Sequence, residues 1–520
     1  MAEIAIATTT HENTTGTTAG TAGTDTAANA AAVSAVAVSA AEAALGVRNR
    51  LVITLLLIST FVVILNETIM GVALPRLMED LSISASAAQW LTSAFMLTMA
   101  VVIPITGFLL QRYNTRPVFI AAMTLFSTGT LIAALAPGFT VLLVARVVQA
   151  TGTAIMFPLL LTTVMTLVPA AHLGRMMGNI SIVISVAPAI GPTISGAILS
   201  VLDWRWMFIL VLPIALTALV VGGILMKNVT TPTKTPIDVL SVILSALGFG
   251  GLVYGLSNLG AAGGGIGSVS GWLPLAVGAL GLTAFILRQL SLQKRNRALL
   301  DLRTFRSRTF TFAIVMMAIS MMALFGTIIL LPIYIQTVLG LDTLTTGLML
   351  LPGGLVMGLL APLVGRLYDR SGPTRLLVTG SVIVSAVFWG MTLLNEHSAP
   401  WMVVAAHVTL SLGLALLFTP LFTAGLAAVR PELYSHGSAM VGTIQQLAGA
   451  FGTALFVTVM ASVAASQLTT GATAVSATSA GIHAAFLCGA VISLFAIPAA
   501  FFIRRAPADA GDAAAGAPAH

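Results

Sequence analysis

A glutamate in the segment ILNETIM is the clearest acidic residue within an apolar stretch of this chain. Glu67 stands about 16 residues into the first such stretch. An ionised carboxylate inside lipid is costly unless it is paired, and protonation is the alternative. A carboxylic acid that binds a proton on one side of a membrane and releases it on the other can act as a proton carrier. We predict this role for Glu67, with a solvated structural carboxylate near the membrane surface as the alternative.

A second polar position lies in the segment LLVARVVQATG. Arg146, Gln149, Thr153 and Phe157 share one face of a helix. A polar stripe within a membrane span must face the bundle interior or a water-filled cavity. We predict that Gln149, Thr153 and Phe157 line a substrate cavity. A fixed structural ion pair is the alternative for Arg146, and a direct pair with Glu67 stays open.

Gln445, in an apolar and glycine-rich stretch, is a further candidate for the substrate cavity. A hydrogen bond between two helices would explain this glutamine equally well.

The composition sets the class of protein that can hold such residues. The chain has 520 residues, of which 58% are hydrophobic and 8% charged, as in a polytopic membrane protein. The net charge of +7 does not indicate a nucleic-acid partner, because the basic residues lie in short loops. A single cysteine excludes an internal disulfide. The sequence holds no phosphate-binding loop and no Cys/His cluster, so we expect no enzyme, no metal and no cofactor, with protons as the coupling ion.

Hydropathy predicts fourteen membrane spans, each an α-helix because lipid offers no hydrogen bonds to the backbone. The predicted spans are 51–73, 87–110, 117–136, 139–168, 176–200, 206–226, 238–259, 272–290, 309–336, 344–365, 375–394, 401–429, 438–464 and 482–503.

The basic residues test this number of spans. With a cytoplasmic N-terminus, 20 of the 23 Lys and Arg residues fall in cytoplasmic loops, as the positive-inside rule requires. Removing one span would reverse every later loop. We therefore expect a multi-pass protein of the bacterial plasma membrane with both termini in the cytoplasm.

The chain contains an internal repeat. Pro104-x-x-Gly107 ends the second span and Pro362-x-x-Gly365 ends the tenth, and a basic loop follows each glycine. The repeat predicts two six-helix bundles with two inserted spans between them, an architecture that is common in secondary transporters. The expected parts are a disordered cytoplasmic tail (1–46), an N-terminal bundle (47–228), the inserted spans (229–292), a C-terminal bundle (293–505) and a second tail (506–520).

The loops after the two glycines resemble a motif of the major facilitator superfamily, G-x-x-x-D-R-x-G-x-R. The second copy matches well, whereas in the first Gln111 replaces the acid. The residues we expect to gate access at these loops are Gly107, Arg112, Arg116, Gly365, Asp369, Arg370 and Arg375. Simple topology signalling is the alternative for the basic residues.

Further motifs resemble the fourteen-helix drug:proton antiporters of that superfamily. The fourth-span motif R-x-x-Q-G-x-G appears at Arg146, and a W-R-W-x-F box begins at Trp204. The fifth-span motif of exporters, G-P-x-x-G-G, lies in the stretch SVAPAIGPTISG as Gly191, Pro192, Ser195 and Gly196, with Pro188 preceding it.

The resemblance covers about residues 48–505 and implies the major facilitator fold. It also implies a role for Arg146 in proton coupling. We expect a proton-coupled exporter of small hydrophobic or amphiphilic drugs from the cytoplasm or inner leaflet, working as a monomer within the bilayer. The alternatives are a dedicated exporter of one endogenous metabolite, lipid or antibiotic, and a membrane sensor that transports nothing.

Overall fold

The computed structural model of the chain describes residues 49–70, 73–74, 76–83, 85–226, 228, 238–260 and 269–504. The two predicted tails lie outside the described residues, as does most of the connection between the sixth and seventh spans.

Long apolar helices make up the described part of the chain, which contains no β-strand. Thirteen of them are long and apolar enough to cross a membrane. A further helix, α5, has 27 residues. The prediction of an all-α polytopic membrane fold with fourteen spans is therefore confirmed.

The first half of the chain contains the helix Asn49–Met70, here called the first-span helix, and α2 to α6. Their bounds are α2 Ala85–Arg112, α3 Thr115–Ala134, α4 Phe139–Leu167, a short turn η1 Ala170–His172, α5 Leu173–Leu199 and α6 Trp206–Leu225. Helix α4 packs on α3 and α2, and α3 also packs on α6. A Cβ atom added at Gly152 of α4 would lie 2.6 Å from the backbone nitrogen of Phe126 in α3, so only glycine permits this close approach.

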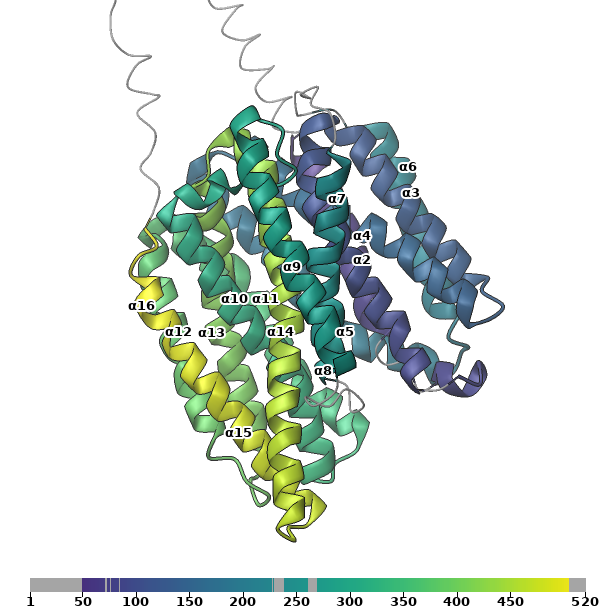
Figure 1. Cartoon of the computed structure of the whole chain (residues 1–520), viewed down its shortest axis with the longest axis vertical. Coiled ribbons are helices and arrows are strands. Elements are labelled where there is room, and N and C mark those ends of the chain that lie inside the picture. The colour runs from purple at the N-terminus through teal and green to yellow at the C-terminus, as the bar shows by residue number, and fades with distance from the viewer. Residues whose placement is uncertain are drawn as a thin grey trace, which may run out of the picture. The chain divides into compact units, whose positions relative to one another are not determined.

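The second half contains α10 to α16. Their bounds are α10 Arg308–Ile333, a π-helical turn η5 Tyr334–Val338, α11 Thr343–Ser371, α12 Pro373–Met391, α13 Pro400–Ala427, a turn η6 Pro431–Leu433, α14 Tyr434–Thr469, α15 Ala474–Leu494 and α16 Ala496–Ala500. In Figure 1, α12, α13 and α15 lie on the left, and α3 and α6 of the first half lie on the right.

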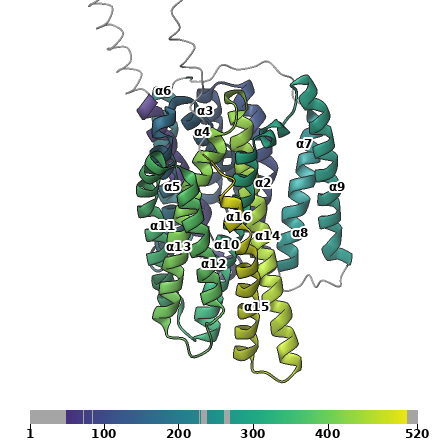
Figure 2. The same ribbon diagram turned by 90° about the vertical axis from the view of Figure 1, so that its left-hand side faces the viewer.

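Between the halves lies a pair of spans, here called the inserted pair. It consists of α7 Val239–Ser245, a π-helical turn η2 Ala246–Gly250, α8 Gly251–Gly260 and α9 Val269–Leu292. The predicted seventh span, 238–259, therefore contains a π-helical segment in its middle. Figure 2 shows the inserted pair on the right, beside α2 and α14.

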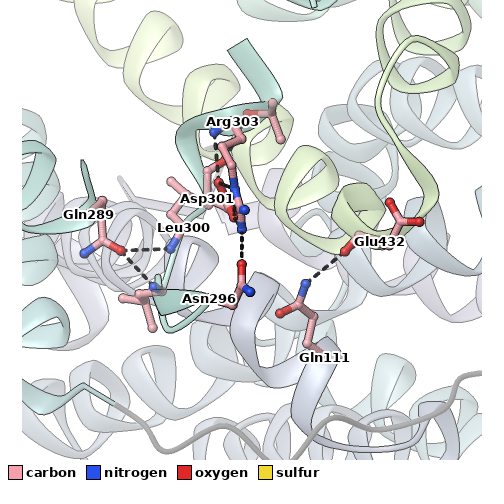
Figure 3. A network of polar contacts seen from close by, with 9 residues as sticks. Gln111, Gln289, Asn296, Leu300, Asp301, Arg303 and Glu432 are labelled. Carbon is pink, nitrogen blue, oxygen red and sulfur yellow. Dashed lines mark hydrogen bonds and ion pairs between the residues drawn. The ribbon is translucent and has the colours of Figure 1, made fainter. Parts of the chain in front are cut away.

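A short segment, here called the linker (residues 293–307), connects α9 to α10 and contains the turns η3 Gln293–Arg295 and η4 Leu302–Arg306. Its apolar residues Leu299 and Leu300 are 1% exposed. The amide oxygen of Gln289 in α9 accepts hydrogen bonds from the backbone nitrogens of both leucines, at 2.7 and 3.2 Å (Figure 3). The linker is thus packed into the protein.

Several helices begin at a side-chain cap, because the first N–H groups of a helix have no partner within it. Asp238 caps α7, Ser307 caps α10, Asp342 caps α11 and Thr473 caps α15. These residues fix the ends of apolar helices whose hydropathy alone leaves the boundaries undefined.

Candidate functional site

Arg146 lies at the centre of a buried polar cluster in the first half. Its side chain is 0% exposed. Nη1 donates hydrogen bonds to Gln149 Oε1 at 2.6 Å and to Asn66 Oδ1 at 3.3 Å. Nε donates to the carbonyl oxygen of Leu91 at 3.5 Å, and the guanidinium lies 4.1 Å from the ring centre of Phe95. Residues of the first-span helix, α2 and α4 thus jointly bind this cation.

Gln149 and Thr153 lie in the same cluster. The amide nitrogen of Gln149 donates to Thr130 Oγ1 of α3 at 2.8 Å, and the hydroxyl of Thr153 donates to the carbonyl oxygen of Gln149 at 3.0 Å. Both side chains are buried. The fourth span therefore has the predicted polar face, and Gln149 on that face helps to hold Arg146 in place.

Glu67 follows Asn66 in the first-span helix and is partly buried. In the described part of the chain, no ion pair of 4.0 Å or less joins Glu67 to Arg146. Two buried donors in this cluster have no hydrogen-bond partner, Arg146 Nη2 and Asn66 Nδ2. An unsatisfied buried donor is costly, so the cluster has room for one more acceptor beside the segment that carries Glu67.

The fifth-span motif packs against this same segment. Helix α5 runs through Pro188 and Pro192 without a break. A Cβ atom added at Gly191 would lie 3.0 Å from Thr68 Cβ, and Ser195 Oγ donates to the carbonyl oxygen of Ile69 at 2.9 Å. Gly196 is exposed and has open space beside it. The motif therefore holds the later turns of α5 against the residues that directly follow Glu67.

The second copy of the loop motif joins the two halves. Asp369, near the end of α11, accepts hydrogen bonds from the backbone nitrogens of Gly174 and Arg175 at 2.8 and 2.9 Å. These are the second and third residues of α5, where a helix favours a negative charge. A Cβ atom added at Gly174 would lie 2.6 Å from the carbonyl oxygen of Gly365, so the two helices touch through glycines.

The first copy makes a related but weaker contact. Gly107 of α2 faces Ser435, His436 and Ala439 of α14. The amide nitrogen of Gln111 donates to the carbonyl oxygen of Glu432 at 3.1 Å, as Figure 3 shows. The two copies therefore occupy equivalent places, since each helix end meets the start of a helix in the other half.

The remaining predicted gate residues lie in other surroundings at the same end of the bundle. The guanidinium of Arg116 donates to the carbonyl oxygen of Gly223 near the end of α6, at 3.0 and 2.6 Å, within its own half. Arg112 lies beside the ring of Tyr113. Arg370 and Arg375 are exposed. We call this end of the bundle, where α2 ends and α5 begins, the basic end.

Contacts between the halves lie toward the basic end. Phe157 of α4 meets Phe422 of α13 with ring centres 6.1 Å apart, and Thr419 of α13 donates to Ser181 of α5 at 2.9 Å. Farther from this end, α5 contacts the first-span helix, and Gly449 and Gly452 of α14 contact α10. The halves thus meet from the basic end to about the middle of these helices, where Gly358 of α11 faces Val186 of α5, and farther on these helices pack within their own halves.

Gln445 and Gln446 lie at the point along α14 beyond which this helix no longer contacts α2. Gln446 Nε2 lies 3.7 Å from the sulfur of Met99 in α2. Gln445 Nε2 is buried and has no hydrogen-bond partner. Together with Phe157 and Phe422, these residues place apolar and amide groups at the junction of the halves.

Sequence reasoning missed Asn66 and the role of the linker. Asn66 is the residue before Glu67 and carries a second hydrogen-bonding group at the same depth, which was the available signal. The linker offered a signal in its apolar segment ALLDL, which stands among basic residues.

Comparisons with known proteins agree with this arrangement. A family model described as Major Facilitator Superfamily matches residues 56–453. The uncharacterized MFS-type transporter YcnB of Bacillus subtilis is 43% identical over 459 residues, 88% of this chain and 96% of that protein. The lincomycin resistance protein LmrB of the same organism is 38% identical over 460 residues, 87% of this chain and 95% of that protein.

Among solved structures, the human organic anion transporter MFSD10 aligns with a TM-score of 0.61 at 15% identity, covering 87% of this chain and 99% of that one. At this identity the likeness shows the fold alone.

Proposed function

The chain belongs to the major facilitator superfamily, and on that premise we propose that it is a proton-coupled antiporter that exports hydrophobic or amphiphilic drugs. Substrate enters from the cytoplasm or the inner leaflet, and the two halves alternate between access to the two sides of the membrane. Its relative LmrB is named for lincomycin resistance, which supports a drug as substrate.

The observation that carries the proton coupling is the incomplete polar cluster around Arg146. Two of its buried donors lack an acceptor, and Glu67 lies in the adjacent segment. An ionised carboxylate at Glu67 supplies an acceptor and a counter-charge, whereas a protonated one supplies much less. Proton binding at Glu67 therefore changes the forces on Arg146, on the first-span helix and on the part of α5 fastened to it.

The basic end is the cytoplasmic end in this proposal. Arg112, Arg175, Arg370 and Arg375 all lie there, and positive charge favours the cytoplasmic side. Because the halves meet at this end, we infer that this arrangement is the state closed toward the cytoplasm. Opening this end requires α5 to leave Asp369 and α2 to leave α14.

The proposed substrate contacts lie within the closed junction and become accessible when the halves part. Phe157 and Phe422, which pack on each other in this state, then offer apolar surface, Met99 offers an adaptable side chain, and the amide nitrogen of Gln445 offers a donor that has no partner. Such a surface suits amphiphiles of varied shape that carry one hydrogen-bond acceptor.

The test measures transport of lincomycin and of ethidium in proteoliposomes with an imposed proton gradient. The variant Glu67→Gln is expected to insert normally and to lose proton-driven transport, while Glu67→Asp retains part of it. Glu79→Gln is the matched control, because that side chain is 72% exposed, and it should transport like the wild type.

Three results would contradict the proposal. Wild-type transport by Glu67→Gln would show that Glu67 is not the proton-binding residue. Efflux that persists when an uncoupler collapses the gradient would exclude proton drive. Failure to move any amphiphile in a broad panel would favour the dedicated exporter or the sensor.

A further inference from the structure

The inserted pair is held together by glycines. A Cβ atom added at Gly251 of α8 would lie 2.8 Å from the Cα atom of Gly278 in α9, and one at Gly248 would lie 2.8 Å from the backbone nitrogen of Leu282. Helices that approach this closely bury much backbone surface against each other. The opposite face of α9 is open, since Leu280 is 72% exposed. In a membrane protein such a face borders lipid.

The other side of the inserted pair contacts both halves of the protein. A Cβ atom added at Gly250 would lie 3.3 Å from Val101 and 3.4 Å from Leu97, both in α2. Farther from the basic end, Trp90 of α2 stacks on Tyr254 of α8 with ring centres 5.6 Å apart. Helix α8 also contacts α14.

Because α2 and α14 contact each other as well, the inserted pair packs along their junction. We call this junction the covered seam. It contains the Gly107 contact, which is one of the two places where the halves must part at the basic end.

Hydrogen bonds fasten the inserted pair to itself and to the linker. Arg288 of α9 donates to both carboxylate oxygens of Asp238, at 2.6 and 2.7 Å. Gln289 donates to Ser241 of α7 at 2.8 Å and accepts from the linker nitrogens of Leu299 and Leu300. The pair is therefore tied to the segment from which the second half begins.

The other junction between the halves is formed by α5 and α11. It lies on the side away from the inserted pair in Figure 2. The two helices meet directly, since a Cβ atom added at Gly178 would lie 2.6 Å from the carbonyl oxygen of Ala361. Leu359 and Leu363 of α11 are 73% and 50% exposed. We call this junction the open seam.

We propose that the inserted pair makes entry from the lipid one-sided, so that amphiphiles dissolved in the membrane reach the interior between α5 and α11 and not between α2 and α14. This inference rests on the proposed function, because it requires the basic end to open. When the halves part, the inserted pair stays over the covered seam and excludes acyl chains there. Lipid then borders only the gap at the open seam.

The experiment compares two buried serines placed near the two seams. Ser181 of α5 is 3% exposed and Ser438 of α14 is 0% exposed. Each is changed to cysteine in a background that carries Cys488→Ala, which removes the native thiol, and Asp369→Asn, which weakens the closed contact. Proteoliposomes are treated with a phosphatidylcholine that bears a maleimide on one acyl chain, or with a membrane-impermeant maleimide from the side of the basic end. Labelling is followed by intact-mass measurement.

We expect the water-soluble reagent to label both cysteines and the lipid reagent to label Ser181→Cys about tenfold faster than Ser438→Cys. Adding Gly250→Trp, which pushes η2 away from α2, should remove this difference. Gly390→Trp is the matched control, because a Cβ atom there meets open space, and it should leave the difference unchanged.

The contrary outcomes are distinct. Equal labelling of both cysteines by the lipid reagent, or labelling of neither while the water-soluble reagent labels both, would overturn one-sided entry and leave the proposed transport intact. No labelling of Ser181→Cys by either reagent would mean that the basic end does not open, which overturns the proposed alternation and the inference with it.

Discussion

Arg146 shows how the protein keeps a buried cation without a bonded carboxylate. Its charge is spread over an amide oxygen from Asn66, another from Gln149, a backbone carbonyl and an aromatic face. Neutral partners stabilise a cation less than an ion pair does. The site therefore remains sensitive to a nearby negative charge, which is the property that a proton-coupled residue needs.

We predict that Arg146→Lys lowers proton-driven transport by at least about tenfold, or about 1.4 kcal/mol. An ammonium group cannot reproduce the planar fork that bonds Gln149 and Asn66 while it stacks on Phe95. The measurement is initial efflux from proteoliposomes, with protein amount determined by immunoblot. Arg76→Lys is the control, since its exposed ion pair with Glu79 should be dispensable. Equal loss in both variants would contradict the prediction.

At this scale the sequence predicted which residues are unusual and could not predict their partners. Glu67 and Arg146 are evident because charge within an apolar span is rare. The bonds from Gln149 to Thr130 and from Arg146 to the backbone of Leu91 depend on how α2, α3 and α4 pack. Helical periodicity places a residue on a face, but it does not say which neighbour that face meets.

Helix α5 takes part both in the contact between the halves and in the contact with the segment that carries Glu67. Its first turns contact α11 of the other half, and its later turns contact the first-span helix of its own half. A helix that is packed at both ends can transmit displacement from one end to the other. In the proposed mechanism, α5 carries a change near Glu67 to the contact with Asp369.

We predict that Gly191→Val impairs transport by about tenfold or more while membrane insertion is retained. Bulk at this position pushes against Thr68 and shifts α5 relative to the segment that carries Glu67. Gly196→Val is a matched control in the same helix, because it has open space beside it and should be tolerated. Transport and surface amount are measured together. A parallel loss of both in Gly191→Val would indicate a folding defect and contradict the prediction.

Element by element, hydropathy and charge located the spans well and their ends poorly. The predicted span 438–464 is α14, Tyr434–Thr469, in the structure. The extra turn at its start holds Ser435 and His436, which face Gly107. Polar residues at a helix start depress hydropathy, so the part of the helix that meets the other half escaped prediction. The π-helical segment η2 also has no hydropathy signal.

On the scale of the whole molecule, the internal repeat predicted that the two loop motifs are equivalent, but it did not predict where the inserted pair lies. Each copy of the loop motif meets the start of a helix in the other half. The copies differ in strength, because Asp369 is a charged acceptor for two backbone nitrogens whereas Gln111 donates to one carbonyl. The inserted pair lies beside the weaker contact, and no feature of its sequence indicated this position.

The attachment of the inserted pair should depend on pH. The hydrogen bonds from Arg288 lower the pKa of Asp238 from 3.8 to about 2. Because this pKa is lower in the folded protein than in the unfolded chain, the contribution to stability is complete above about pH 4. It is lost as the pH falls toward 2.

We therefore predict that Asp238→Asn lowers the melting temperature of the purified protein by about 2 °C at pH 6. The difference from the wild type should shrink between pH 4 and pH 2. Thermal unfolding of the detergent-solubilised protein measures both values. The control is Glu79→Gln, which should melt with the wild type at each pH. A difference that stays constant down to pH 2 would refute the assignment.

The glycine contacts between α8 and α9 have a consequence for the order in which the protein is made. These helices are neighbours in sequence, so they can pair as soon as both have left the ribosome, with little chain entropy lost in closing so short a loop. Helix α14 is synthesised much later. When it reaches the membrane, α2 and α8 have already been made, so α14 can dock on both of them last. A substitution that separates α8 from α9 should therefore impair biogenesis first, because α14 of the nascent chain would lack the surface on which it docks.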